Sequence, residues 1–217
     1  MAKGNGTTRA SSPSANSKPQ TFEEQVDSAL VGLRGEFFDR MDDFYENSFD
    51  RWQKRFEEWK EKEDYIYQGQ SSVSAVEANR REREIYGENY RGLPHYRIGN
   101  DLRDEYSDLT SGGYYTGNKA PTFWDIKAGR GNISQARQAV KDTAQRNAEK
   151  KFAEVRSKML KSTVEKGIDL SKAKVQSASG DGFLISDGKI TLHARYILAW
   201  GEIKAPHFRF IITDRKS

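Results

Sequence analysis

The sequence contains no cysteine, which excludes disulfide bonds, thiolate zinc sites and a cysteine nucleophile. No apolar run approaches the roughly 20 residues that a membrane-spanning helix needs, so we expect no membrane partner. Apolar residues make up only 35% of the 217 residues, and charged residues make up 31%. With so little apolar surface to bury, a core that includes the whole chain is not expected. We predict one compact part joined to extended segments.

Residues 1–20 have no acidic side chain and no apolar stretch. Small polar residues dominate this segment, together with Lys3, Arg9 and Lys18. Such a composition is typical of a disordered basic tail. The absence of an apolar h-region argues against a Sec signal.

The net charge of +4 conceals a division between the two halves of the chain. Residues 21–109 carry 13 basic and 22 acidic side chains, whereas residues 133–217 carry 17 basic and 9 acidic ones. A basic second half favours a polyanionic partner such as nucleic acid. The alternative is that the two halves neutralise each other within the molecule.

A long amphipathic helix is predicted after the tail. Thr21 and Glu24 match a capping box, in which each side chain accepts a hydrogen bond from the backbone N–H of the other residue. We expect the helix to cover residues 21–62, within an acidic aromatic segment 21–68. Its apolar stripe must pack on the rest of the chain, on a second copy or on a protein partner. The stripe has the period of one helical face and consists of Phe22, Val26, Leu30, Leu33, Phe37, Met41, Tyr45, Phe49, Trp52, Phe56 and Trp59.

Residues 69–132 are predicted to form a loop-rich connector with short helices at 75–86 and 101–109. Glycine, proline and asparagine recur in it at short intervals, as turn-forming residues do. Arg130 lies between two glycines, resembles one unit of an RGG segment, and is a candidate nucleic-acid contact. The aromatic residues of this segment can anchor it on a folded surface or stack on unpaired bases. They are Tyr86, Tyr90, Tyr96, Tyr106, Tyr114, Tyr115, Phe123 and Trp124.

A second helix is predicted to run from Asn132, a favourable N-cap residue, to Gly167, a natural helix stop. One of its faces is apolar. The other is basic and includes Lys150 and Lys151, which are candidate contacts to phosphates unless the face is merely solvated. We assign residues 133–217 to a basic domain in which this helix packs on a sheet.

Beyond the second helix the apolar period drops to two, which predicts short antiparallel strands. Residues 187–188 are Asp-Gly, a strong hairpin signal. A two-residue turn there sets Ile185 opposite Ile190 and Phe183 opposite Leu192. The predicted fold class is therefore α+β: a long N-terminal amphipathic helix, a loop-rich connector, and a helix packed on a C-terminal antiparallel β-meander.

The last two predicted strands carry the clearest functional signal in the chain. Side chains alternate across a strand, and the even-numbered residues of both strands are apolar. The odd-numbered face holds His193, Arg195, His207 and Arg209, with Lys189 at the start of the first strand and no carboxylate. Any connecting loop with an odd number of residues keeps these side chains on one face, where we expect them to converge.

In topology and residue type, the C-terminal helix and sheet resemble the barnase, EndoU, colicin and RelE group of small metal-independent ribonucleases. That group places His, Arg, Lys or Tyr on an antiparallel sheet behind a helix. The resemblance implies that His193 and His207 act as general acid and base, in an order left open. Arg195 and Arg209 would clamp the phosphate. Glu202, in the adjoining loop, is an alternative base.

Three functional hypotheses remain open. The first is binding of RNA or single-stranded DNA through the phosphate backbone, and the second is metal-independent cleavage of RNA. The third is a structural or assembly role, in which the helix over residues 21–62 associates with itself or with a protein partner. We predict no cofactor and no metal, although His193, His207 and Glu202 are an alternative ligand set.

The polar first residues, together with residues 193–217, give the chain the general look of small proteins from phages and other mobile elements. This resemblance implies a location in the host cytoplasm or in a virion. It implies no particular activity.

Overall fold

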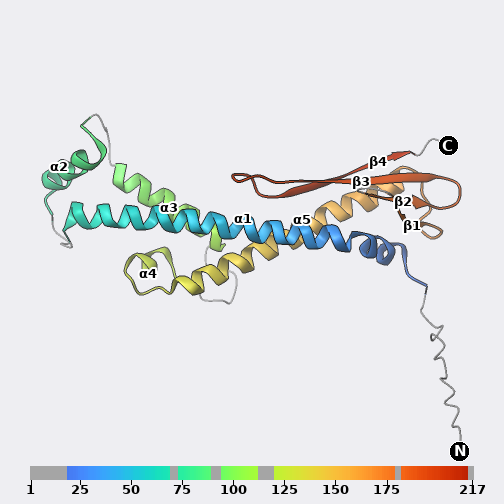
Figure 1. The fold of residues 1–217 in the computed structure, drawn as a ribbon, viewed down its shortest axis with the longest axis horizontal. Coiled ribbons are helices and arrows are strands. Elements are labelled where there is room, and N and C mark those ends of the chain that lie inside the picture. The colour runs from blue at the N-terminus through green and yellow to red at the C-terminus, as the bar shows by residue number, and fades with distance from the viewer. Residues whose placement is uncertain (1–18, 69–72, 89–93, 112–119, 179–181, 215–217) are drawn as a thin grey trace, which may run out of the picture.

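The computed structural model describes residues 19–68, 73–88, 94–111, 120–178 and 182–214. Within them the chain forms five helices followed by four strands, so the predicted α+β class is confirmed (Figure 1). None of these helices is long and apolar enough to cross a membrane. Almost all of the predicted tail, residues 1–20, lies outside the described residues. The elements are α1 (Phe22–Tyr67), α2 (Ala75–Tyr86), α3 (Pro94–Thr110), α4 (Phe123–Lys127), α5 (Ile133–Glu165), β1 (Lys174–Ser177), β2 (Gly182–Ser186), β3 (Thr191–Ala199) and β4 (His207–Asp214).

Helix α1 begins at the predicted capping box. The Thr21 hydroxyl accepts a hydrogen bond from the backbone N–H of Glu24 at 3.2 Å, and the Glu24 carboxylate accepts one from the backbone N–H of Thr21 at 2.8 Å. The helix continues to Tyr67, beyond the predicted end. Every residue of the predicted stripe is buried except Tyr45, which is half-buried. The chain itself therefore covers the stripe.

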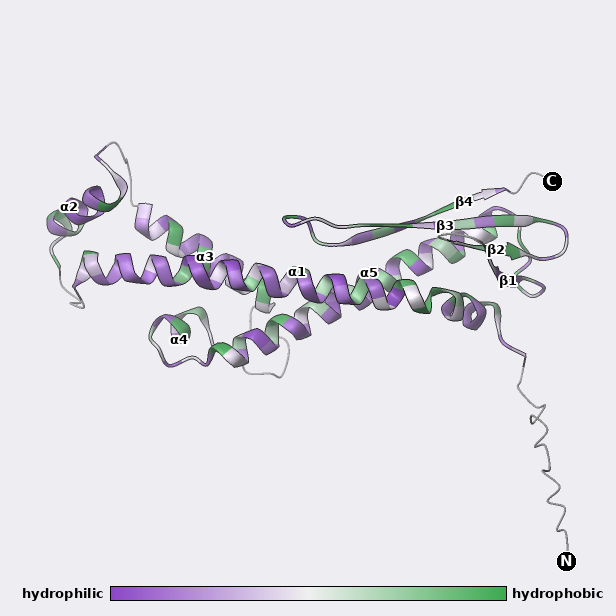
Figure 2. Ribbon diagram, viewed as in Figure 1, coloured by the Kyte–Doolittle hydropathy of each residue, from purple (hydrophilic) through white to green (hydrophobic). Residues whose placement is uncertain are grey.

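Two apolar clusters follow one another along α1. The first joins the N-terminal half of α1 to the sheet and to the second half of α5, and in it the rings of Phe37 and Phe208 lie 4.8 Å apart. The second joins the C-terminal half of α1 to α3, α4 and the start of α5, around Trp52. Tyr45 packs against both clusters. The molecule is therefore an elongated body built on the α1–α5 pair, in which apolar residues recur at intervals along both helices (Figure 2).

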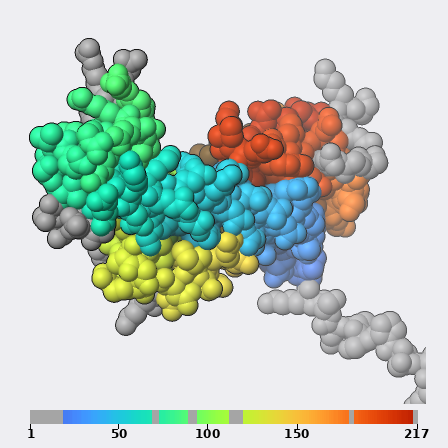
Figure 3. All heavy atoms as spheres, turned by 60° about the vertical axis from the view of Figure 1, so that its left-hand side comes forward, coloured from blue at the N-terminus to red at the C-terminus, as the bar shows by residue number. Residues whose placement is uncertain are grey.

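The segment predicted as a connector supplies much of the second cluster. Helix α3 begins earlier than predicted, and α4 was not predicted. The Trp52 indole N–H donates to the backbone carbonyl of Leu102 at 2.8 Å, and the Tyr106 hydroxyl donates to the carbonyl of Pro121 at 2.6 Å. These contacts attach α3 and the loop before α4 to α1 and to each other. In Figure 3 the α2–α3 end (green) and the sheet (red) stand as separate masses above α1.

The aromatic residues of this segment are divided between the core and the surface. Tyr106 and Phe123 are buried in the second cluster. Tyr96 and Trp124 are exposed. The stacking hypothesis also named three tyrosines outside the described residues: Tyr90, Tyr114 and Tyr115.

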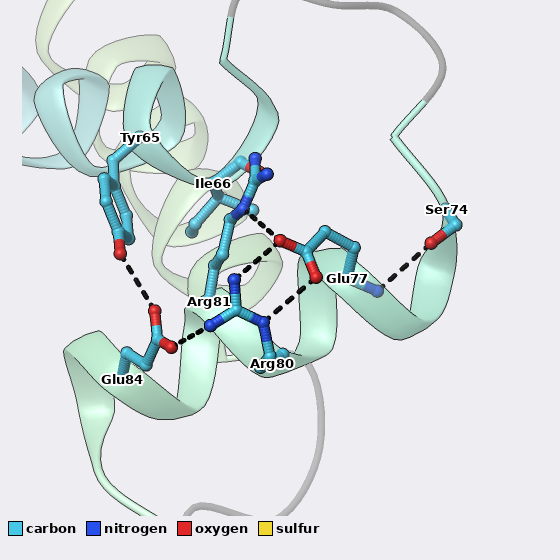
Figure 4. A network of polar contacts seen from close by, with 7 residues as sticks. All are labelled: Tyr65, Ile66, Ser74, Glu77, Arg80, Arg81 and Glu84. Atoms are coloured by element: carbon cyan, nitrogen blue, oxygen red, sulfur yellow. Dashed lines mark hydrogen bonds and ion pairs between the residues drawn. The ribbon is translucent and has the colours of Figure 1, made fainter.

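Helix α2 is attached to the end of α1 mainly by polar contacts (Figure 4). The Ser74 hydroxyl caps α2 by accepting the backbone N–H of Glu77 at 3.2 Å. Hydrogen bonds from Arg80, aided by those from Arg81, lower the pKa of Glu77 to about 2. Arg81 also donates to the backbone carbonyl of Ile66 at 2.9 Å, which connects the two helices.

The four strands form an antiparallel meander in the order β1-β2-β3-β4. Ile185 pairs with Leu192, so the predicted pairing with Ile190 is wrong by two residues. The Asp187 carboxylate accepts the backbone N–H groups of Lys189 and Ile190 at 2.9 Å each, and this stabilises a longer turn than the predicted one. A shift of two residues keeps every side chain on its predicted face.

Candidate nucleic-acid interface

The C-terminal sheet has one covered face and one open face. Alternate residues, such as Ile185, Leu192 and Phe208, are buried against α1 and α5. No described helix lies over the opposite face, which we call the outer face (Figure 1). The outer face consists of Lys174, Gln176, Leu184, Ser186, Thr191, His193, Arg195, Ile197, Ala199, His207, Arg209, Ile211 and Thr213.

The two arginines predicted as site residues are neighbours on the outer face. Arg195 lies opposite Ile211, and Arg209 lies opposite Ile197, so the guanidinium-bearing positions are diagonal to each other. Each predicted histidine lies two residues outward from the arginine of its own strand. The four side chains therefore form a row along the hairpin: His193, Arg195, Arg209 and His207.

The two histidines of the row are far apart. Because Ala199 lies opposite His207, the ladder separates His193 from His207 by about 20 Å, at roughly 3.3 Å per residue. Acid and base catalysis at one phosphodiester needs both groups within hydrogen-bond reach of it. The expected convergence is therefore wrong, and the predicted catalytic pair is not brought together. Glu202, the alternative base, is exposed in the β3–β4 loop, where its backbone carbonyl accepts a hydrogen bond from Arg51 at 3.2 Å.

The row is basic and open to solvent. Arg195, Arg209 and His207 are exposed, and His193 is half-buried. None of the strand residues on the outer face is a carboxylate. The row can therefore attract an anion without an acidic group competing for the guanidinium groups.

Lys189 lies in the turn that precedes β3. The backbone N–H groups of Asp169, Ile190 and Lys189 all donate to the Asp187 carboxylate, and they lower its pKa to about 2. This carboxylate is occupied by the backbone and holds the shape of the turn. The side chain of Lys189 is exposed beside it, near the His193 end of the row.

Part of the basic charge of α5 is neutralised by α1. Arg156 donates to Asp27 at 2.9 Å, and Arg137 contacts Asp50 at 2.8 Å. Asp27 is the main cause that raises the pKa of Arg156. Ion pairs within the molecule therefore account for part of the charge difference between the acidic first half and the basic second half of the chain.

Three other predicted contacts lie away from the row. Lys150 and Lys151 belong to α5, which packs on the covered face of the sheet. Lys150 is two residues from the buried Phe152, about 200° around the helix from it, and so points away from the sheet. Arg130 lies just after α4, 3.6 Å from Asp125, and α4 is at the end of the molecule opposite the sheet (Figure 1).

The third histidine is a core residue. His95 is only 2% exposed and stacks on Trp59 with ring centroids 5.1 Å apart. Its Nδ1 shares a hydrogen bond of 3.0 Å with the Tyr86 hydroxyl. Burial, together with the charges of Lys127 and Lys62, lowers the pKa of His95 to about 4, so the ring is neutral. Among the described residues, no three His, Cys, Asp or Glu side chains are arranged to hold a metal ion.

A groove of about 430 Å³ lies between β4 and the second half of α5. Arg209 lines it together with Lys158 of α5 and Lys166, the C-cap residue of that helix. The sequence does not single out these two lysines, because only the packing of α5 beside β4 brings them near Arg209. The helical periodicity places Lys158 on the basic face of the second helix, but it does not show which strand that residue lies beside.

No family model, curated protein or solved structure matches this chain. The resemblance to small ribonucleases therefore stays a prediction, and function has to be argued from the geometry and charge of the outer face.

Proposed function

We propose that the protein binds the phosphate backbone of RNA or single-stranded DNA through the outer face of its C-terminal sheet. The row formed by His193, Arg195, Arg209 and His207 carries the proposal, because it is about 20 Å long and no carboxylate interrupts it. Guanidinium groups form strong, charge-assisted hydrogen bonds with phosphate oxygens. A row of this length suits several successive phosphates better than a single one.

Such contacts predict modest sequence specificity. Phosphate contacts fix the register and orientation of a nucleic acid, but they carry no direct information on its bases. Affinity is then expected to fall steeply with salt, since each neutralised phosphate releases counterions.

The other two hypotheses have less support. A ribonuclease of the predicted type needs His193 and His207 at one phosphate, and the register keeps them apart. Assembly through residues 21–62 needs an exposed apolar stripe, and the chain itself buries that stripe. The proposal therefore rests on the outer face.

The test is the salt dependence of binding for two arginine variants. Arg195→Ala and Arg209→Ala should each weaken binding of a single strand of about 20 nucleotides by about tenfold. Each should also reduce the slope of log K against log salt concentration by about 0.7, the value for one phosphate contact on a single strand. Fluorescence anisotropy of a labelled strand at several salt concentrations measures both quantities.

Arg97→Ala is the matched control, because Arg97 is an exposed arginine of α3, remote from the sheet. It removes the same charge and should leave the affinity and the salt slope near those of the wild type. If both outer-face variants bind as tightly as the Arg97 variant, the outer face is not the binding surface.

A further inference from the structure

We infer that the groove beside β4 receives an unpaired base of the bound strand, so that the protein selects single-stranded over duplex nucleic acid. The inference rests on the proposed function, because the strand on the outer face would deliver the base. Strand β4 is the last strand of the sheet, and its free edge borders the groove.

The groove has an apolar floor with an aromatic ring in it. Val155 of α5 and the inner-face residues Phe210 and Ile212 of β4 line it, and all three are half-buried. The ring of Phe210 meets the rings of Phe183, Tyr196 and Phe208 at angles of 69°, 78° and 83°. These steep contacts hold the Phe210 ring in place, but none of the three neighbours stacks parallel to it. Among the described residues, the ring therefore has no stacking partner.

The rim of the groove is cationic on balance. Lys158, Lys166 and Arg209 line it, with Glu165 as the acidic residue. Lys166 lies 3.7 Å from Asp214, and Glu165 lies 3.9 Å from a lysine of its own helix, so only part of this charge is compensated. An apolar floor beneath a positive rim is complementary to a nucleotide, which joins an aromatic base to a phosphate.

Arg209 connects the groove to the row. Its side chain lies on the outer face beside the diagonal neighbour Arg195, and the residue also lines the groove at the edge of β4. A strand whose phosphates follow the row can therefore turn over the edge of β4 at Arg209 and place its next base in the groove. The volume, about 430 Å³, lies within the range of small-ligand sites.

This arrangement favours a single strand on energetic grounds. Stacking of one base on an aromatic side chain is worth on the order of tenfold in affinity. A base in a duplex is already paired and stacked, and it has to be flipped out before it can enter a groove. Duplex nucleic acid would then use the row alone.

The first experiment compares a labelled thymidine oligomer with an abasic oligomer of the same length and phosphate number. The wild-type protein should bind the thymidine oligomer about tenfold more tightly. If both oligomers bind equally well, the base-binding inference is overturned and phosphate binding stands. If neither binds at low salt, the proposed function itself fails.

A pair of serine variants tests the location. Ser162 lines the groove, and Ser162→Tyr should fill it and lower thymidine affinity to the abasic level while leaving abasic binding unchanged. Ser157→Tyr adds the same side chain at an exposed position of α5 and should change neither affinity.

The circular dichroism of both variants confirms that they fold. If Ser162→Tyr does not fold, the wild-type comparison of the two oligomers still tests the inference. A folded Ser162→Tyr protein that retains the full preference for thymidine would place the base elsewhere. If the groove instead accepts a peptide strand along β4, the wild-type protein would bind the thymidine and abasic oligomers equally well. This result would also overturn the inference.

Discussion

At the scale of single residues, His95 makes the clearest link between burial and pH. Its ring stacks on Trp59 and is held neutral, with its pKa lowered to about 4 from the ordinary 6.5. In the unfolded chain the same ring takes up a proton near pH 6.5. The unfolded state therefore binds more protons as the pH falls from about 6.5 to about 4, and the folded state loses stability across that window. The loss reaches about 3 kcal/mol for the full shift.

We predict that His95→Gln removes this dependence. Urea unfolding of the wild type should show its free energy of unfolding decline between about pH 6.5 and about pH 4, and the variant should show a flatter profile. Carboxylates titrate in both proteins, so the difference between the two profiles isolates His95. His207→Gln is the control, because His207 is an exposed histidine of the outer face and its variant should follow the wild type. Parallel profiles for wild type and His95→Gln would show that His95 does not titrate in this way.

At the scale of elements, the sequence shows which side chains share a face better than it shows which of them meet. The capping box at Thr21 and the period of the stripe predict α1 because both are local. Strand parity likewise places Arg195 and Arg209 on one face, since a register shift of two residues leaves the faces unchanged. The true register between β2 and β3 depends on Asp187, whose side chain accepts two backbone N–H groups in a turn that the Asp-Gly pattern alone does not specify.

The spread of the row follows from the register between β3 and β4. Residues 200–206 connect β3 to β4, so the hairpin pairs Ala199 with His207 and leaves His193 at its other end. Strand parity does not mark where this loop begins, because polar and apolar residues still alternate from Glu202 to Ala205. Helix α4 and the start of α3 were missed for a different reason. Their burial against α1 is a long-range contact that local periodicity does not contain.

The packing of α5 separates two predicted phosphate contacts from the outer face. Lys150 and Lys151 were candidate phosphate contacts, yet α5 packs on the covered face of the sheet. A combined Lys150→Ala and Lys151→Ala variant should therefore bind a labelled single strand within about twofold of the wild type, with only a long-range electrostatic loss. Anisotropy at moderate salt measures this. A loss as large as that of Arg195→Ala would mean that the bound strand also follows α5.

At the scale of the whole molecule, the two clusters share their helices. Phe37 belongs to the cluster with the sheet, and Trp52 and Trp59 belong to the cluster with α3 and α4. Both sets are on α1, and α5 also contributes residues to both clusters. Loss of packing in one cluster therefore destabilises the helices on which the other cluster depends. The sheet and the distant α3–α4 end should then unfold together, with one free energy of unfolding.

We predict that Phe37→Ala lowers the free energy of unfolding by about 3–5 kcal/mol, the usual cost of a large cavity at a fully buried phenylalanine. Because α1 joins the clusters, the loss should appear equally in two signals. One is the far-ultraviolet circular dichroism of the helices, and the other is the tryptophan fluorescence, to which the buried Trp52 and Trp59 of the other cluster contribute. Val31→Ala, at an exposed position of the same helix, is the control and should shift neither transition. If the fluorescence transition stays in place while the circular dichroism shifts, the clusters unfold independently and the shared helices do not couple them.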